Sequence, residues 1–261
     1  MHIVVLAKPV PDTTGQERLA PDGRLDRAAV PAVVNANDEY ALEAALKLIE
    51  ASPDGGEVTL LAMAPAGATD TLRKGLAMGA TRAVLVTDPL LDGSCALSTI
   101  RVLAAALRGL TYDLVIAGAD TSDGGGGIVA AGVATLLGLP YLSYAAQIEP
   151  ADGRVTVRRI SATGYDVIEA PMPALVVATQ ALGEPRYPSL KGIMGARNKE
   201  MTLHSLADLD LGGVAVGGAV STTRLTGSRQ PPPRDATRVI RKPAVEAARE
   251  VVDFLAERRI V

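Results

Sequence analysis

The chain has few aromatic residues: its 261 residues include one Phe, six Tyr and no Trp. This shortage argues against a platform that stacks single-stranded nucleic acid on aromatic side chains. The apolar residues still make up 48% of the sequence, so the core must consist mainly of Ala, Val, Leu and Ile. An aliphatic core of this kind suits helices packed on a sheet.

Cysteine and histidine are also scarce. The single cysteine, Cys95, excludes an internal disulfide and a multi-cysteine metal site, and it fits a reducing compartment. His2 and His204 are interpreted as surface residues, so a Ser–His–Asp or Cys–His arrangement is not expected. The lack of visible catalytic machinery favours a protein that binds or carries over one that turns over a substrate.

The sequence also lacks a large excess of positive or negative charge, and it lacks long apolar runs. The 26 Lys and Arg residues against 29 Asp and Glu give a net charge of −3 and no electrostatic reason to expect nucleic acid. The N-terminus shows neither a basic segment nor a cleavage motif, so no signal peptide is expected. No uninterrupted apolar run approaches the roughly 20 residues of a membrane span. We therefore expect a soluble, cytoplasmic protein without membrane insertion.

Through the first 180 residues, short apolar runs alternate with stretches of helical periodicity. This alternation predicts an α/β fold with a Rossmann-like, mostly parallel sheet. The expected strands are 3–7, 58–64, 83–87, 114–118 and 174–179, and the expected helices are 38–51, 70–78, 94–108 and 128–137.

After Pro140 the pattern changes to that of a hairpin. Segments 143–149 and 154–160 flank an Asp-Gly turn, with 165–169 as a third strand, which predicts an antiparallel extension at one edge of the sheet. From Gly183 onward the chain is irregular, with a stiff Pro231–Pro233 linker and one amphipathic helix at 245–258. We expect a compact domain over 1–182 and a tail that is flexible or, as the helix favours, wrapped around a partner.

The strongest local signal is the segment 114–138, LVIAGADTSDGGGGIVAAGVATLLG. A buried strand leads through four glycines into a helix, an arrangement that lets backbone N–H groups and the helix dipole hold a phosphate. No Lys-Ser/Thr follows, so it is not a P-loop, and it matches the dinucleotide fingerprint only loosely. The alternative is a flexible loop over a helix start. Asp120 and Asp123 are candidates for Mg²⁺ or for loop capping.

A second polar group surrounds the start of the first helix, at Asn35, Asn37, Asp38 and Glu39. These side chains can act as an Asx cap, with Asp38 as the capping residue, or they can also bind the hydroxyls of a ribose. The residues alone leave both interpretations open.

The segment 184–200, EPRYPSLKGIMGARNKE, resembles the signature of the β subunits of electron transfer flavoproteins. Four other motifs occur in the order of that family: LAKPVPD, AVVNANDEYALEAAL, LRKGLAMGATRAVLV and TSDGGGG. The resemblance covers the chain to about Met201 and, more loosely, the remainder.

The resemblance implies an adenine-nucleotide-binding α/β fold with a buried AMP, in a heterodimer whose α subunit holds the redox FAD. Many members of the family carry Asn, Gln or Thr where this chain has Gly127, Ile128 and Val129, so backbone groups must bind there. The implied nucleotide contacts are Leu6, Asn35, Ala36, Asn37, Asp38, Met63, Ala119, Asp123, Gly126, Gly127, Ile128 and Val129.

The resemblance also implies two contacts with partners. Asp166 matches a position where the family often has a Glu that faces the flavin, and Leu190 matches the apolar anchor of the loop that docks dehydrogenases. Residues 183–201 would form this docking loop, and 202–261 an arm that packs on the α subunit.

The implied function is electron carriage without catalysis by this chain. Acyl-CoA-type dehydrogenases of fatty acid β-oxidation reduce the FAD, and electrons pass to an electron transfer flavoprotein–quinone oxidoreductase. One alternative is a bifurcating subunit with a second FAD in the AMP position. Another is a stand-alone nucleotide-binding module of the universal-stress type.

Overall fold

Apolar side chains point alternately to opposite sides of the first strand, β1 (His2–Leu6). Ile3 and Val5 belong to one buried cluster, whereas Val4 and Leu6 belong to a second. The computed structural model describes residues 1–15, 18–229, 232 and 237–261. The two clusters show that the central sheet is covered on both faces, as expected for continuous apolar strands.

The central sheet has nine strands in the order β11-β5-β4-β1-β6-β10-β7-β8-β9. The first seven of these run parallel, and β8 and β9 run antiparallel at one edge. The fold is therefore α/β with a mostly parallel sheet and an antiparallel edge extension, as predicted. The strands β4 to β10 are Glu57–Met63, Arg82–Val86, Leu114–Gly118, Tyr141–Ala151, Arg154–Ser161, Gly164–Pro171 and Ala174–Ala178.

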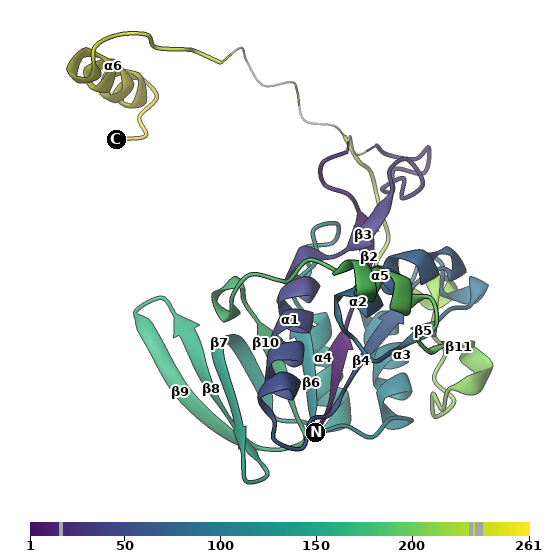
Figure 1. Cartoon of the computed structure of the whole chain (residues 1–261). Helices are drawn as coiled ribbons and strands as arrows, with labels where there is room; N and C mark the ends of the chain where they lie inside the picture. Colours follow the sequence, from purple (N-terminus) through teal and green to yellow (C-terminus); the bar gives the residue numbers. More distant parts are fainter. Residues whose placement is uncertain (16–17, 230–231, 233–236) are drawn as a thin grey trace. The chain divides into compact units, whose positions relative to one another are not determined.

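Two pairs of helices cover the two faces of the sheet (Figure 1). Helices α1 (Ala36–Ala51) and α2 (Thr69–Met78) contribute Leu42, Leu46, Leu72 and Leu76 to the cluster that contains Ile3. Helices α3 (Ala96–Arg108) and α4 (Val129–Leu137) contribute Val102, Leu107 and Val133 to the other. All four begin and end within two residues of the predicted bounds.

The antiparallel extension consists of β7, β8 and β9. The turn between β7 and β8 has positive φ at both Asp152 and Gly153, at 49° and 74°, which is the geometry of a two-residue hairpin turn. Val155 and Val157 are buried in the core, and two exposed ion pairs, Arg154–Glu169 and Arg159–Asp166, join β8 to β9.

The sequence pattern did not predict two elements that follow Gly183. Helix α5 (Leu190–Ala196) packs on α2, and strand β11 (Met201–His204) pairs with β5. The first compact unit consequently runs from Met1 to Thr226. A second unit, Gly227–Val261, contains α6 (Ala244–Glu257), which matches the predicted helix. The predicted linker 231–233 lies largely outside the described residues.

Shorter elements complete the chain. Strands β2 and β3 form a two-stranded sheet of their own. None of the described helices is long and apolar enough to cross a membrane. The bounds are β2 Pro9–Pro11, β3 Ala32–Val34 and, for the 3₁₀ helices, Ala66–Ala68, Pro89–Leu91, Gln180–Leu182, Leu206–Asp208 and Gly218–Val220.

Candidate functional site

A cavity of about 360 Å³ opens at the carboxyl ends of β1, β4 and β6. These strands lie where the order of the sheet reverses, since β4 follows β1 on one side and β6 pairs with β1 on the other. Ligands of open α/β sheets bind at such switch points. The volume lies at the lower end of the roughly 300–1,000 Å³ typical of ligand pockets.

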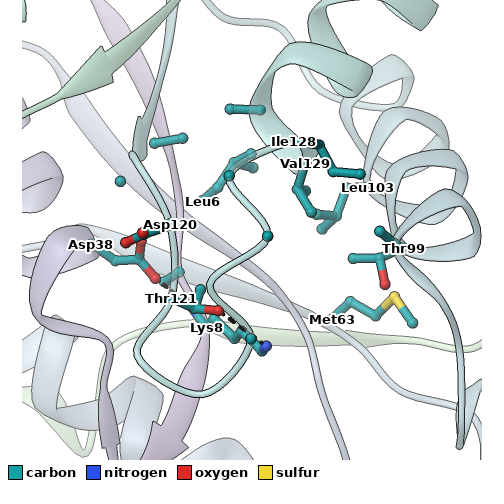
Figure 2. Close-up of a pocket in the computed structure, with 18 of the residues that line it drawn as sticks. Leu6, Lys8, Asp38, Met63, Thr99, Leu103, Asp120, Thr121, Ile128 and Val129 are labelled. Atoms are coloured by element: carbon teal, nitrogen blue, oxygen red, sulfur yellow. Dashed lines mark hydrogen bonds between the residues drawn. The ribbon is translucent and has the colours of Figure 1, made fainter. Parts of the chain in front are cut away.

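One wall of the cavity is the glycine loop, which we define as residues 119–128 (Figure 2). Its bend is fixed by the carbonyl of Thr121, which accepts from the N–H groups of Gly124 and Gly125. Gly125 and Gly127 have φ of 54° and 61°, a backbone conformation that strains residues with a side chain. The loop leads into α4, whose first N–H groups have no acceptor within the helix. This wall suits an anion.

The opposite wall is aliphatic. Leu6 and Met63 come from the strand ends, and Thr99 and Leu103 from α3 (Figure 2). Ile128, which is half exposed, closes the cavity on the side of the glycine loop. The site therefore joins an apolar slot to a polar cradle, and no Tyr or Phe is among the residues that line it.

The floor of the cavity is formed where β6 passes the start of α1. A β-carbon at Gly118 would lie 2.7 Å from the carbonyl carbon of Asn37 and closer still to the carboxylate of Asp38. Only glycine fits between these two elements. The close approach places Asp38 in the lining of the cavity.

Asp38 is a buried carboxyl group, only 5% exposed. Burial raises its pKa to about 7, against hydrogen bonds that favour the anion, including one from the backbone N–H of Lys8 at 2.8 Å. The prediction that Asp38 caps α1 is wrong: the N-cap is Asn35, and neither side chain caps the helix. Asp38 instead ties the turn after β1 to the start of α1.

Asn35 and Asn37 hold the glycine loop from behind. The Asn35 amide donates to the carbonyl of Asp120 at 2.8 Å and accepts from the N–H of Ser122 at 3.1 Å. The Asn37 amide donates to the Asp120 carboxylate at 2.6 Å. These contacts engage both asparagines with the loop, so they shape the cavity from outside its lining.

Asp123 is the most enclosed charge of the glycine loop. Its side chain is 1% exposed and lies 2.9 Å from Lys8 Nζ and 2.5 Å from Arg27 Nη2. Burial raises the pKa of Asp123, but the hydrogen bond from Lys8 and the contacts with Thr121 and Arg27 outweigh it and lower the pKa. The carboxylate thus serves two protein cations and is not open to Mg²⁺.

The structure brings most of the predicted contact residues together. Asn35, Asn37 and Asp123 lie in a second layer, and Ala36 is exposed at the start of α1. Asp166 lies on the exposed extension, 2.7 Å from Arg159. Those in the lining are Leu6, Asp38, Met63, Ala119, Gly126, Gly127, Ile128 and Val129.

Sequence reasoning missed the contribution of α3 and of two cations. Thr99 and Leu103 belong to an ordinary amphipathic helix, and nothing in the pattern separates them from core residues. Lys8 and Arg27 reach Asp123 from far along the chain. The only available signal was the LAKPVPD motif, which contains Lys8.

We call residues 184–200 the docking segment, after the role that the family resemblance implies, and none of them lines this cavity. Arg186 forms ion pairs with Glu43, through Nε at 2.8 Å, and with Glu50, both on α1. Ser189 caps α5 by accepting from the N–H of Gly192 at 3.0 Å. Leu190 is 76% exposed, so its apolar side chain is available for contact.

Comparisons with known proteins agree with this architecture. The sequence model of the electron transfer flavoprotein domain matches residues 22–209. The electron transfer flavoprotein β subunits of Mycobacterium tuberculosis and Clostridium acetobutylicum are each 37% identical, covering 100% of this chain and 99% and 100% of their own lengths. The caffeyl-CoA reductase-Etf complex subunit CarD of Acetobacterium woodii is 35% identical, with 100% coverage of both. The chain belongs to the family of electron transfer flavoprotein β subunits.

Proposed function

We propose that this chain is the β subunit of a heterodimeric electron transfer flavoprotein, that it binds a structural AMP, and that its α partner holds the redox FAD. The FAD supplies the electron storage when it is bound. This chain binds the nucleotide, supports the flavin from one side and presents the docking segment, so it is a carrier subunit without its own turnover.

The observation that carries this proposal is the junction of an apolar slot with a glycine cradle in one cavity of about 360 Å³. The slot between Met63 and Leu103 suits an adenine ring, and the first turn of α4 suits a single phosphate. FAD adds a second phosphate, a ribityl chain and a flavin ring to AMP, and that ring finds no aromatic partner among the lining residues. Both features favour a mononucleotide.

Identification of the bound nucleotide tests the proposal. The chain is co-expressed with its α partner, the complex is denatured, and the released nucleotides are separated by chromatography. We expect one AMP and one FAD per heterodimer. Two FADs would contradict the AMP assignment, and a stable monomer that captures neither an α chain nor flavin would contradict the heterodimer.

The second candidate is a bifurcating subunit, with FAD in place of AMP. The similarity to a subunit of a caffeyl-CoA reductase-Etf complex favours it, as do the two cations beside the glycine loop, which would suit a second phosphate. This candidate predicts two FADs in the same chromatogram and oxidation of NADH by the complex. AMP without NADH oxidation would reject it.

We propose that the docking segment binds acyl-CoA-type dehydrogenases of fatty acid β-oxidation. The electron acceptor would be a quinone oxidoreductase, and the protein would act in the cytoplasm. Leu190→Ala removes the exposed anchor, and we expect it to slow reduction by the dehydrogenase at least tenfold, about 1.4 kcal/mol. Leu90→Ala, at a leucine of the same compact unit that is 70% exposed, serves as the control. Equal rates would remove Leu190 from the interface.

For Asp166, the features that support a role beside the flavin are its negative charge and its exposed position. On β9 it presents a carboxylate beside Arg159, where we propose that it faces the flavin of the α subunit. Loss of a nearby negative charge favours flavin reduction. Asp166→Asn is therefore expected to raise the flavin potential, while Glu169→Gln on the same strand serves as the control.

A further inference from the structure

Two cations from the N-terminal part of the chain converge on one carboxylate of the glycine loop. Lys8 Nζ lies 2.9 Å from Asp123 Oδ1, and Arg27 Nη2 lies 2.5 Å from Oδ2. The side chain of Asp123 is 1% exposed, whereas those of Lys8 and Arg27 are 40% and 49% exposed. Two partly exposed cations thus compensate one buried carboxylate. Removing either cation leaves the negative charge of Asp123 poorly compensated.

Arg27 belongs to the excursion, which we define as residues 18–31 between β2 and β3. No residue of this segment is buried, so apolar packing does not fix its position. Its local structure is limited to turns and one bridge between Leu19 and Leu25. The contact of Arg27 with Asp123 is therefore a principal tether between the excursion and the glycine loop.

The excursion also reaches the other wall of the cavity. The guanidinium of Arg24 lies over Gly93, because a β-carbon at Gly93 would be 2.9 Å from Arg24 Nη1. Gly93 directly precedes Ser94, which lines the cavity together with Thr99. Arg24 and Arg27 thus extend from one segment to the two walls between which the nucleotide is proposed to bind.

The glycine loop needs such a tether. Four consecutive glycines have little conformational preference of their own, so contacts from outside the loop must select the closed form. Asn35 and Asn37 hold its first half, at Asp120 and Ser122. Asp123 is the last of these contacts, directly before the four glycines.

We infer that Arg27 and Asp123 are positioning residues that close the glycine loop and the excursion over the bound nucleotide and so set its rate of exchange. The inference rests on the proposed nucleotide site. It assigns to the excursion a role in retaining the nucleotide, while the cradle itself supplies the affinity for phosphate.

A chase experiment on the full-length chain, in the complex in which it purifies, tests this role. The complex is loaded with radiolabelled AMP, unlabelled AMP is added in excess, and the release of label is followed. We expect Arg27→Gln and Asp123→Asn each to release AMP about tenfold faster than wild type. The double variant should be no faster than Asp123→Asn, because that single change already removes the contact with Arg27.

Salt and a matched variant separate tethering from general destabilisation. Raising the ionic strength should accelerate release more strongly from wild type than from Asp123→Asn. Arg154→Gln removes an exposed ion pair of the same kind on the extension and should leave release unchanged. If Asp123→Asn fails to fold, Arg27→Gln alone decides, because Arg27 is half exposed.

The outcomes distinguish the two proposals. Wild type that holds AMP, together with an unchanged release rate in Arg27→Gln, would overturn the tether and leave the nucleotide site standing. Additive effects of the two variants would also overturn it. Wild type that binds no AMP would overturn the AMP assignment and the tether with it.

Discussion

The cavity and the docking segment belong to the same compact unit but are held in place by different means. The cavity depends on a close backbone approach at Gly118, on the turn conformation of the glycine loop and on the buried carboxyl groups of Asp38 and Asp123. The docking segment is largely exposed and is held by side chains that reach across to α1 and α2. A rigid pocket and a presented surface thus need different residues.

The docking segment is held by hydrogen bonds to backbone carbonyls as well as by ion pairs. Lys199 donates to the carbonyls of Leu76 and Ala80, at 2.9 and 2.6 Å, where α2 ends. Arg73 on α2 donates to the carbonyl of Ala196 at 2.8 Å, where α5 ends. Each helix end is therefore satisfied by a cation of the other segment. Such ties fix a surface without burying it.

The largest effect is expected at the floor of the cavity. Gly118→Ala places a methyl group against Asn37 and the Asp38 carboxylate, which forces α1 away from β6. We expect a loss of about 3 kcal/mol in the free energy of unfolding and loss of the bound nucleotide. Urea denaturation and nucleotide release measure the two losses. Gly67→Ala, where a β-carbon meets nothing within 4 Å, is the control, and equal stability of the two variants would contradict the close approach.

The buried carboxyl group of the cavity should make stability depend on pH. The folded chain keeps a proton on Asp38 up to about pH 7, whereas the unfolded chain loses it near 3.8. Between these values the folded state binds more protons, so stability falls as pH rises. Relative to Asp38→Asn, wild type should lose roughly 2 to 3 kcal/mol between pH 5 and 8. Urea denaturation at both pH values measures this, and parallel pH profiles would show that Asp38 is ionised throughout.

The charged tie of the docking segment should matter somewhat less. Arg186→Gln leaves Glu43, whose side chain is 5% exposed, with only Lys47, at 3.7 Å, as a counter-charge. Because Arg186 itself is one-third exposed, we expect a loss of about 2 kcal/mol, below the value for a fully buried pair. Thermal and urea denaturation measure it. The exposed pair broken by Arg154→Gln should cost less than about 1 kcal/mol, and a similar cost for both would mean that burial of Glu43 is unimportant.

The smallest effects on the free energy of unfolding are expected at the two glycines of α5, which differ in their surroundings. A β-carbon at Gly192 would collide with the carbonyl oxygen of Ala77, whereas one at Gly195 meets nothing within 4 Å. Gly192→Ala should therefore cost about 1–2 kcal/mol by separating α5 from α2. Gly195→Ala should be neutral or stabilise by up to about 1 kcal/mol through helix propensity. Urea denaturation compares them, and the opposite order would show that α5 does not rest on α2.

Much of the fold followed from the sequence because its strands and helices carry strong periodic signals. Strand β6 is a continuous apolar run, and α2 and α4 end at glycines with positive φ, so their bounds were predictable. Strand β11 has only four residues and no buried one, and α5 contains two glycines in seven residues. Neither forms a pattern of its own, and only pairing with β5 and packing on α2 define them.

The site was predictable to the extent that it is local. The glycine run before α4 revealed the cradle, and the family resemblance added Leu6 and Met63. The tether between Arg27 and Asp123, by contrast, joins residues far apart in the chain, and hydrophobic periodicity carries no information about such a pair. Thr99 and Leu103 face the cavity because of where α3 lies in the fold.

Helix α1 has a consequence for how insertions and deletions are tolerated. Its 16 residues, about 24 Å in length, carry the floor of the cavity at the first turn and the partners of Arg186 further on. Glu43 and Glu50 lie about two turns apart and therefore share one face. A single inserted residue before Glu43 would rotate both carboxylates by about 100° away from Arg186. The number of residues in α1 thus sets the spacing between the cavity and the docking segment. Substitutions in this helix should be tolerated far better than insertions or deletions.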